Sequence, residues 1–107
     1  MKRFRVEFSL EAREDIDRSF EWGRITWGDE AAIRWYRKLT TYTRKVLSVA
    51  PLAQPVAPEG RELGRDIRHL IFDRYRILFE VSGNLVKVLH IKGAFVSKQD
   101  GDLGVEK

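Results

Sequence analysis

Hydrophobic and polar residues alternate at the start of the chain. In RFRVEF, residues 3–8, three apolar side chains alternate with three charged ones, which is typical of a strand with one buried face. Ser9 then offers a helix N-cap, and an apolar stripe at steps of three and four predicts a helix over about 10–26. The residues of that stripe are Ala12, Ile16, Phe20, Gly23 and Trp27.

A second helix is predicted over about 30–49, after a break and a new N-cap at Gly28-Asp29. One or two linking residues would join the two helices into an antiparallel hairpin. Their Trp and Tyr residues are interpreted as core rather than as a binding site. The apolar stripe of the second helix consists of Ala32, Trp35, Tyr36, Leu39, Tyr42, Val46 and Val49.

Three prolines, Pro51, Pro55 and Pro58, mark the next segment, and residues 51–64 are expected to form a surface loop. From about Asp66 to Phe95 the pattern is strand-like. Turns are predicted at Asp73-Arg74 and over residues 82–84.

A two-residue turn at Gly83-Asn84 sets the pairing of the last two strands. It places Glu80 opposite Lys87, Phe79 opposite Val88, Val81 opposite Val86 and Leu78 opposite Leu89. One face then carries Tyr75, Ile77, Phe79, Val81, Val86, Val88 and His90 toward the helices, and the other carries Arg74, Arg76, Leu78, Glu80, Lys87, Leu89 and Ile91. A three-residue loop would instead bring His90 to the face of Arg76, because a one-residue shift moves every side chain to the opposite face.

These elements predict an α+β fold in the order β-α-α-β-β-β, in which a two-helix hairpin packs on one face of a small antiparallel sheet. The other face is expected to stay uncovered. We expect a single domain over residues 1–96 and a flexible tail over residues 97–107, which are polar and without periodicity. A chain of 107 residues can bury about two-thirds of its unfolded surface.

Composition and charge narrow the class of protein. The chain contains no cysteine, which fits a reducing cytoplasm, and no apolar stretch is long enough to cross a membrane or to act as a signal peptide. The net charge is +4, and residues 61–98 hold eight basic and four acidic residues. A basic excess of this kind is compatible with an acidic protein partner or with nucleic acid.

Familiar catalytic motifs are missing from the sequence. It has no phosphate-binding glycine loop, no nucleophile elbow and only two histidines, His69 and His90, so neither a cofactor nor a metal is expected. A metal-independent ribonuclease would need cations for the phosphorane and groups that transfer protons. Candidates for those roles are Arg68, Arg74, Arg76, Lys92 and His90.

The chain resembles the RelE/ParE superfamily, whose members are toxins of bacterial type II toxin–antitoxin systems. The resemblance covers about residues 3–95 and rests on WGDEAAIRWYRKL, on DRYRILFEV with the hairpin ending in LVKVLHIKG, and on the order of the elements. It implies a plasmid-stabilisation toxin, active in the cytoplasm and neutralised by a cognate antitoxin.

The resemblance also divides the superfamily by target. RelE-like members cleave mRNA on the ribosome, whereas ParE-like members lack the nuclease residues and inhibit DNA gyrase. This chain has Ala94 and Phe95 where nuclease members tend to carry His, Arg or Tyr, and it reads Asp66-Ile67-Arg68 where they often carry lysines or a catalytic acid. Because neither Ala94 nor Phe95 can move a proton, the ParE-like interpretation is favoured over a ribosome-dependent nuclease, and an inactive homologue is the third alternative.

On this interpretation the basic face of the sheet is the expected surface for the target or the antitoxin, together with the groove beside the second helix. The residues assigned to it are Arg68, Arg74, Arg76, Leu78, Lys87 and Lys92.

Overall fold

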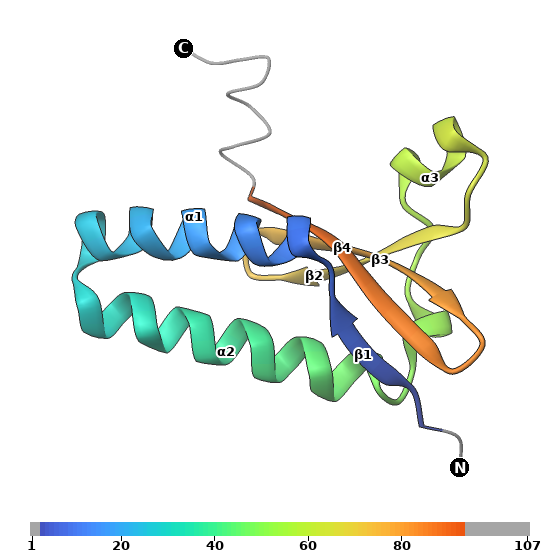
Figure 1. Cartoon of the computed structure of the whole chain (residues 1–107), viewed down its shortest axis with the longest axis horizontal. Coiled ribbons are helices and arrows are strands. Elements are labelled where there is room, and N and C mark those ends of the chain that lie inside the picture. Colours follow the sequence, from blue (N-terminus) through green and yellow to red (C-terminus); the bar gives the residue numbers. More distant parts are fainter. Residues whose placement is uncertain (1–2, 94–107) are drawn as a thin grey trace.

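The computed structural model describes residues 3–93, and it confirms the predicted α+β class and the order of the main elements (Figure 1). Strand β1 (Arg5–Phe8) leads into helices α1 (Leu10–Trp27) and α2 (Asp29–Leu47). A 3₁₀ turn, η1 (Pro51–Ala53), and a short helix, α3 (Pro58–Leu63), precede strands β2 (Ile67–Phe72), β3 (Tyr75–Ser82) and β4 (Leu85–Gly93). The predicted domain boundary at residue 96, the tail at 97–107, and Ala94 and Phe95 lie outside the described residues.

Local capping explains where the helical hairpin begins and turns. The Ser9 hydroxyl accepts a hydrogen bond from the Ala12 N–H at 3.0 Å, as expected for an N-cap. Gly28 ends α1 and begins α2 with a φ of 99°, a backbone conformation that only glycine adopts without strain. Gly28 therefore takes the cap position itself, and Asp29 is the first residue of α2.

The sheet has the strand order β1-β4-β3-β2. Strands β2, β3 and β4 pair antiparallel, as predicted. Strand β1 pairs in parallel with β4, so the complete sheet is mixed. The helical hairpin between β1 and β2 supplies the long connection that a parallel neighbour requires.

The predicted hairpin register is correct from the turn as far as Phe79, where a β-bulge shifts the pairing. Glu80, Phe79 and Val81 face Lys87, Val88 and Val86 as expected, but Leu78 faces His90 instead of Leu89. The extra residue in β4 brings Ile91 opposite Ile77, where it is 5% exposed within the core. The prediction that Ile91 lies on the outer face, and His90 among the helix-facing core residues, is therefore wrong.

Asp15 of α1 explains how the shifted strand is held. Pairing with β1 ends at Val88, and further along β4 the Asp15 Oδ2 accepts the Ile91 N–H at 2.9 Å and lies 3.1 Å from the His90 Nδ1. A side chain of α1 thus accepts a backbone hydrogen bond from β4 beyond the point at which β1 ends.

The main core lies between the sheet and the helical hairpin and is built around Phe79, Ile77 and Leu39. Several aromatic residues predicted to be core are exposed instead: Trp27, Tyr36 and Tyr42. Thr43 and Leu47 occupy buried positions of α2 in their place. Trp27 is the last residue of α1, and Figure 1 shows that the turn between α1 and α2 extends well beyond the sheet.

The segment predicted as an irregular loop instead covers the outer face of the sheet. Pro58 is favourable in the first turn of α3, and Gly64 ends that helix in the left-handed conformation with a φ of 67°. Ala57, just before α3, packs with Ile67 and Leu78 in a second buried cluster. The expectation that this face stays uncovered is therefore wrong.

Gly60 is the point at which α3 approaches β2 most closely, so we predict that Gly60→Ala is destabilising. A methyl group there would collide with the Arg65 carbonyl oxygen and lie 2.7 Å from the Ile67 nitrogen. Overpacking against backbone typically costs about 1–3 kcal/mol, which should appear as a lower midpoint in urea denaturation.

Gly23→Ala is the matched control for this substitution. Its new methyl group would make ordinary contacts of 3.4–3.6 Å with Trp27 and Ala32, and replacing a glycine inside a helix gains up to about 1 kcal/mol. Equal destabilisation by both substitutions would contradict the close contact at Gly60.

Candidate functional site

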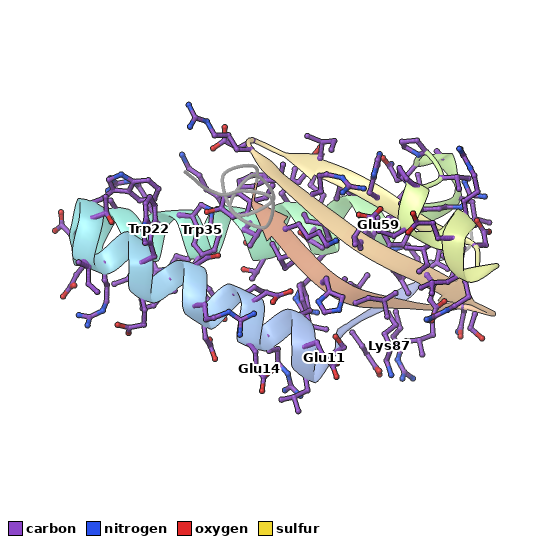
Figure 2. All side chains as sticks on the ribbon, turned by 90° about the horizontal axis from the view of Figure 1, so that it is seen from above. Glu11, Glu14, Trp22, Trp35, Glu59 and Lys87 are labelled. Carbon is purple, nitrogen blue, oxygen red and sulfur yellow. The ribbon has the colours of Figure 1, made fainter. Side chains whose placement is uncertain are left out.

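The basic outer face of the sheet contains an ion cluster centred on Glu59 of α3. The two terminal nitrogens of Arg76 in β3 each donate to one Glu59 carboxylate oxygen at 2.8 Å. The Lys92 ammonium, from the neighbouring position of β4, lies 3.3 Å from the same carboxylate. Figure 2 shows Glu59 reaching over the strands from α3. Sequence reasoning had selected Arg76 and Lys92 but missed the acid that joins them.

His69 of β2 completes this cluster. Its Nδ1 lies 2.9 Å from an Arg76 terminal nitrogen. Because a guanidinium can only donate, Nδ1 accepts and the ring proton sits on Nε2. Burial, and then the charge of Arg76, lower the pKa of His69 below its ordinary value, so the ring is neutral at pH 7.

The electrostatics of the cluster favour a closed ion pair over an active site. The hydrogen bond from Arg76 lowers the pKa of Glu59 to about 2, and the same contact raises the pKa of Arg76. The carboxylate thus stays ionised and binds both terminal nitrogens of Arg76. A phosphate group would have to compete with Glu59 for those nitrogens, and His69 has no free basic nitrogen in this arrangement.

Two other predicted site residues also have structural roles. The Arg68 guanidinium donates to the carbonyl oxygens of Gln54 at 2.8 Å and Leu52 at 3.3 Å, so it holds η1 and the chain after it against β2. Leu78 is buried in the cluster with Ala57 and Ile67. Neither side chain is presented on an open surface, and their roles in partner binding stay predictions.

Arg74 and Lys87 lie apart from the Glu59 cluster, whereas His90 lines a pocket that also contains Glu59 and Lys92. Arg74 is exposed at the β2–β3 turn, and Lys87 is exposed on β4 (Figure 2). Glu80, the expected ion partner of Lys87, instead binds Arg65 at 2.5 Å. The His90 side chain is 48% exposed beside Asp15. Of the predicted residues, the structure therefore joins Arg76 and Lys92 to Glu59 and His69, and it places Leu78, His90 and Lys92 along one pocket.

A faint signal for Glu59 was present in the sequence. Ala57-Pro58-Glu59 reads as a helix start, with proline and an acid in the first turn. The partner of Glu59 lies 17 residues further along the chain, and only the paired strands bring it close. Among residues 3–93, no group of three or more potential metal ligands occurs, and no helix there could span a membrane.

Comparison with known proteins agrees with this architecture. The order of its elements and the strand order of its sheet are those expected for the RelE/ParE superfamily. Residues 6–94 match the family described as "ParE toxin of type II toxin-antitoxin system, parDE". The chain therefore belongs to the ParE toxin family.

A solved structure shows the same fold. It is titled "Chromosomal ParDE TA system from P. aeruginosa", and its chain has 17% sequence identity and a TM-score of 0.69 over 84% of this chain and 95% of that chain. At this identity the similarity shows the fold alone. No curated protein matches the sequence.

The Glu59–Arg76 pair predicts an acid-dependent loss of stability. A carboxyl group whose folded pKa is lowered from 4.5 to about 2 stabilises the fold above its unfolded pKa, and this contribution is lost as the pH falls from 4.5 toward 2. We expect Glu59→Gln to reduce the free energy of unfolding at pH 7 by about 1–3 kcal/mol. The wild type and this variant should converge near pH 2 in urea titrations.

Glu62→Gln, on the exposed side of the same helix, is the control for the loss of a negative charge. It should change stability at pH 7 by less than about 0.5 kcal/mol. A constant difference between wild type and Glu59→Gln from pH 7 to pH 2 would contradict the assigned ion pair.

Proposed function

We propose that this chain is a growth-inhibiting toxin that acts in the cytoplasm by binding DNA gyrase, without chemistry of its own, and that a cognate antitoxin neutralises it. Membership of the ParE toxin family supports the proposal. The observation that carries it further is the occupied Arg76: the strand cation that a nuclease would direct at phosphate is already bound through both terminal nitrogens to Glu59.

The titratable groups near Arg76 support the same conclusion. RNA cleavage through the 2′-hydroxyl needs one group to remove a proton and another to return it to the leaving oxygen. Near Arg76 the described titratable groups are Glu59, His69 and Lys92, and each already contacts another member of the cluster. In the sequence, Ala94 and Phe95 follow Gly93 directly, and neither side chain titrates.

A ribosome-dependent nuclease is the second candidate, because one observation favours it. Arg76 and Lys92 both bind the Glu59 carboxylate and His69 contacts Arg76, so displacement of Glu59 would leave two cations with an imidazole beside them. Such a set could stabilise a pentacovalent phosphate and move a proton. This candidate requires α3 to move when the substrate binds.

Expression without antitoxin should separate the two candidates. We predict growth arrest with induction of a DNA-damage reporter, because a gyrase inhibitor interferes with DNA topology, while cellular mRNA stays intact by primer extension. Cuts at codon positions together with a silent damage reporter would support the nuclease instead. Harmless accumulation of folded protein would contradict both candidates and identify an inactive homologue.

A further inference from the structure

The solvent-facing side of α2 carries basic residues with no acid between them. The two acids of this helix, Asp29 and Glu30, both lie in its first turn. From there to the end of α2 every charged residue is a cation, and all of these cations are exposed. We call them the basic crest, and they are Arg34, Arg37, Lys38, Arg44 and Lys45.

The helical period places the basic crest opposite the buried side of α2. The buried residues of this helix are Ala32, Leu39, Thr43 and Leu47. At about 100° per residue, the crest cations fall on the other side of the helix in two rows. Arg37 and Arg44 form one row, and Lys38 and Lys45 form the second. In each row the two residues are two turns, or about 10 Å, apart.

Hollows on both sides make this part of α2 a ridge. Arg44 lines a hollow of about 600 Å³ that α2 shares with α1 and β1. Lys38 and Lys45 line a second hollow, of about 440 Å³, on the side of β2. A large ligand can therefore approach the crest without meeting another element on either flank.

The crest cations have no carboxylate partner among residues 3–93. Arg44 is held in place, because its guanidinium donates to the Val6 carbonyl at 3.2 Å and lies 5.0 Å from the centre of the Phe8 ring. Neither contact neutralises its charge. Helix α1 differs, because it mixes five acids with three arginines, and two of those arginines, Arg18 and Arg24, form ion pairs.

Helix stability does not account for this arrangement. Opposite charges three or four residues apart stabilise an exposed helix, and like charges at that spacing destabilise it. Arg34 has cations at both spacings, Arg37 and Lys38. The helix dipole favours Arg44 and Lys45 in the last turn, but it does not reach the three cations in the middle. An anionic ligand would offset this repulsion.

Duplex DNA matches the basic crest better than an acidic protein does. The centre of a protein interface is apolar or aromatic, whereas the exposed residue between the two rows of the crest is Thr41. Interfaces with DNA are polar and strongly basic. The major groove of B-DNA, about 12 Å wide, admits an α-helix, so cations on the two flanks of a helix can meet the phosphates on both sides of the groove.

We propose that the basic crest of α2 binds duplex DNA through phosphates on the two sides of one groove, without reading the base sequence. The Arg37–Arg44 row meets one strand and the Lys38–Lys45 row meets the other. Phosphate contacts position a protein on DNA and carry no sequence information of their own. This activity goes beyond the proposed function and does not depend on it, so DNA binding by the chain can fail while inhibition of gyrase stands.

Salt-dependent binding to a fluorescent duplex of arbitrary sequence tests the activity, with the full chain freed of antitoxin. Contacts from the five crest cations predict a slope of about −4.5 for log K against log salt concentration. The affinity should therefore fall by more than about a hundredfold between about 50 and 200 mM salt. No binding at about 50 mM salt, or a slope near zero, would overturn the proposal.

A pair of triple variants tests the location. The crest variant is Arg34→Gln, Lys38→Gln and Lys45→Gln. The control removes the same charge at exposed residues outside α2 and is Arg3→Gln, Arg61→Gln and Lys87→Gln. Each lost phosphate contact lowers the salt slope by about 1, so the crest variant should lose about 3 in slope and at least about tenfold in affinity. The control should lose less than about threefold in affinity, and equal losses would assign the effect to net charge and overturn the crest. Thermal denaturation verifies that both variants are folded.

Lysine acetylation followed by mass spectrometry locates the contact without any substitution. Lys38 and Lys45 should become protected by about tenfold when the duplex is added at low salt, whereas Lys87, exposed on β4, should stay reactive. Equal protection of Lys87 would overturn the assigned surface.

Two other polyanions test the choice of ligand. The major groove of A-form RNA is too deep and narrow for protein side chains to read, so an RNA duplex that binds as tightly as DNA would overturn the groove contact. Polyglutamate that displaces the DNA at an equal concentration of charge would assign the crest to an acidic protein and overturn the proposal.

Discussion

The bidentate ion pair between Arg76 and Glu59 is the contact on which the outer half of the molecule depends. It joins the middle strand of the antiparallel hairpins to a six-residue helix that is too short to be stable alone. Ala57, Ile67 and Leu78 are buried beneath that helix, so the charge pair and the apolar contacts hold α3 together. Both side chains are less than one-third exposed, and removing Glu59 leaves the Arg76 charge uncompensated in a partly desolvated place.

Because the segment around α3 covers the outer face of the sheet, basic residues of that face bind groups of the same chain. Arg76 and Lys92 share a carboxylate from the same chain, and Arg68 is used to hold the preceding loop. Arg74 and Lys87, by contrast, face solvent. The proposed inhibition by binding follows from this division between cations that hold the fold and cations that face solvent.

Much of the fold could be predicted from the sequence because its signals are local. The N-cap at Ser9, the break at Gly28 and the turns at Asp73 and Gly83 depend on a few neighbouring residues. The β-bulge could not be predicted, because it depends on Asp15 of α1, which accepts the Ile91 N–H from 76 positions away. The exposure of Trp27 could not be predicted either, since an apolar stripe does not show where the sheet beside a helix ends.

We propose above all that this ParE-family chain inhibits its target by binding and not by cleaving RNA. The purified toxin can be titrated into a DNA gyrase supercoiling reaction, beside a reconstituted translation reaction that contains a defined mRNA. We predict a dose-dependent loss of supercoiling, reversed by the antitoxin, and an uncut mRNA. Unaffected supercoiling together with cleavage of the mRNA on the ribosome would contradict it.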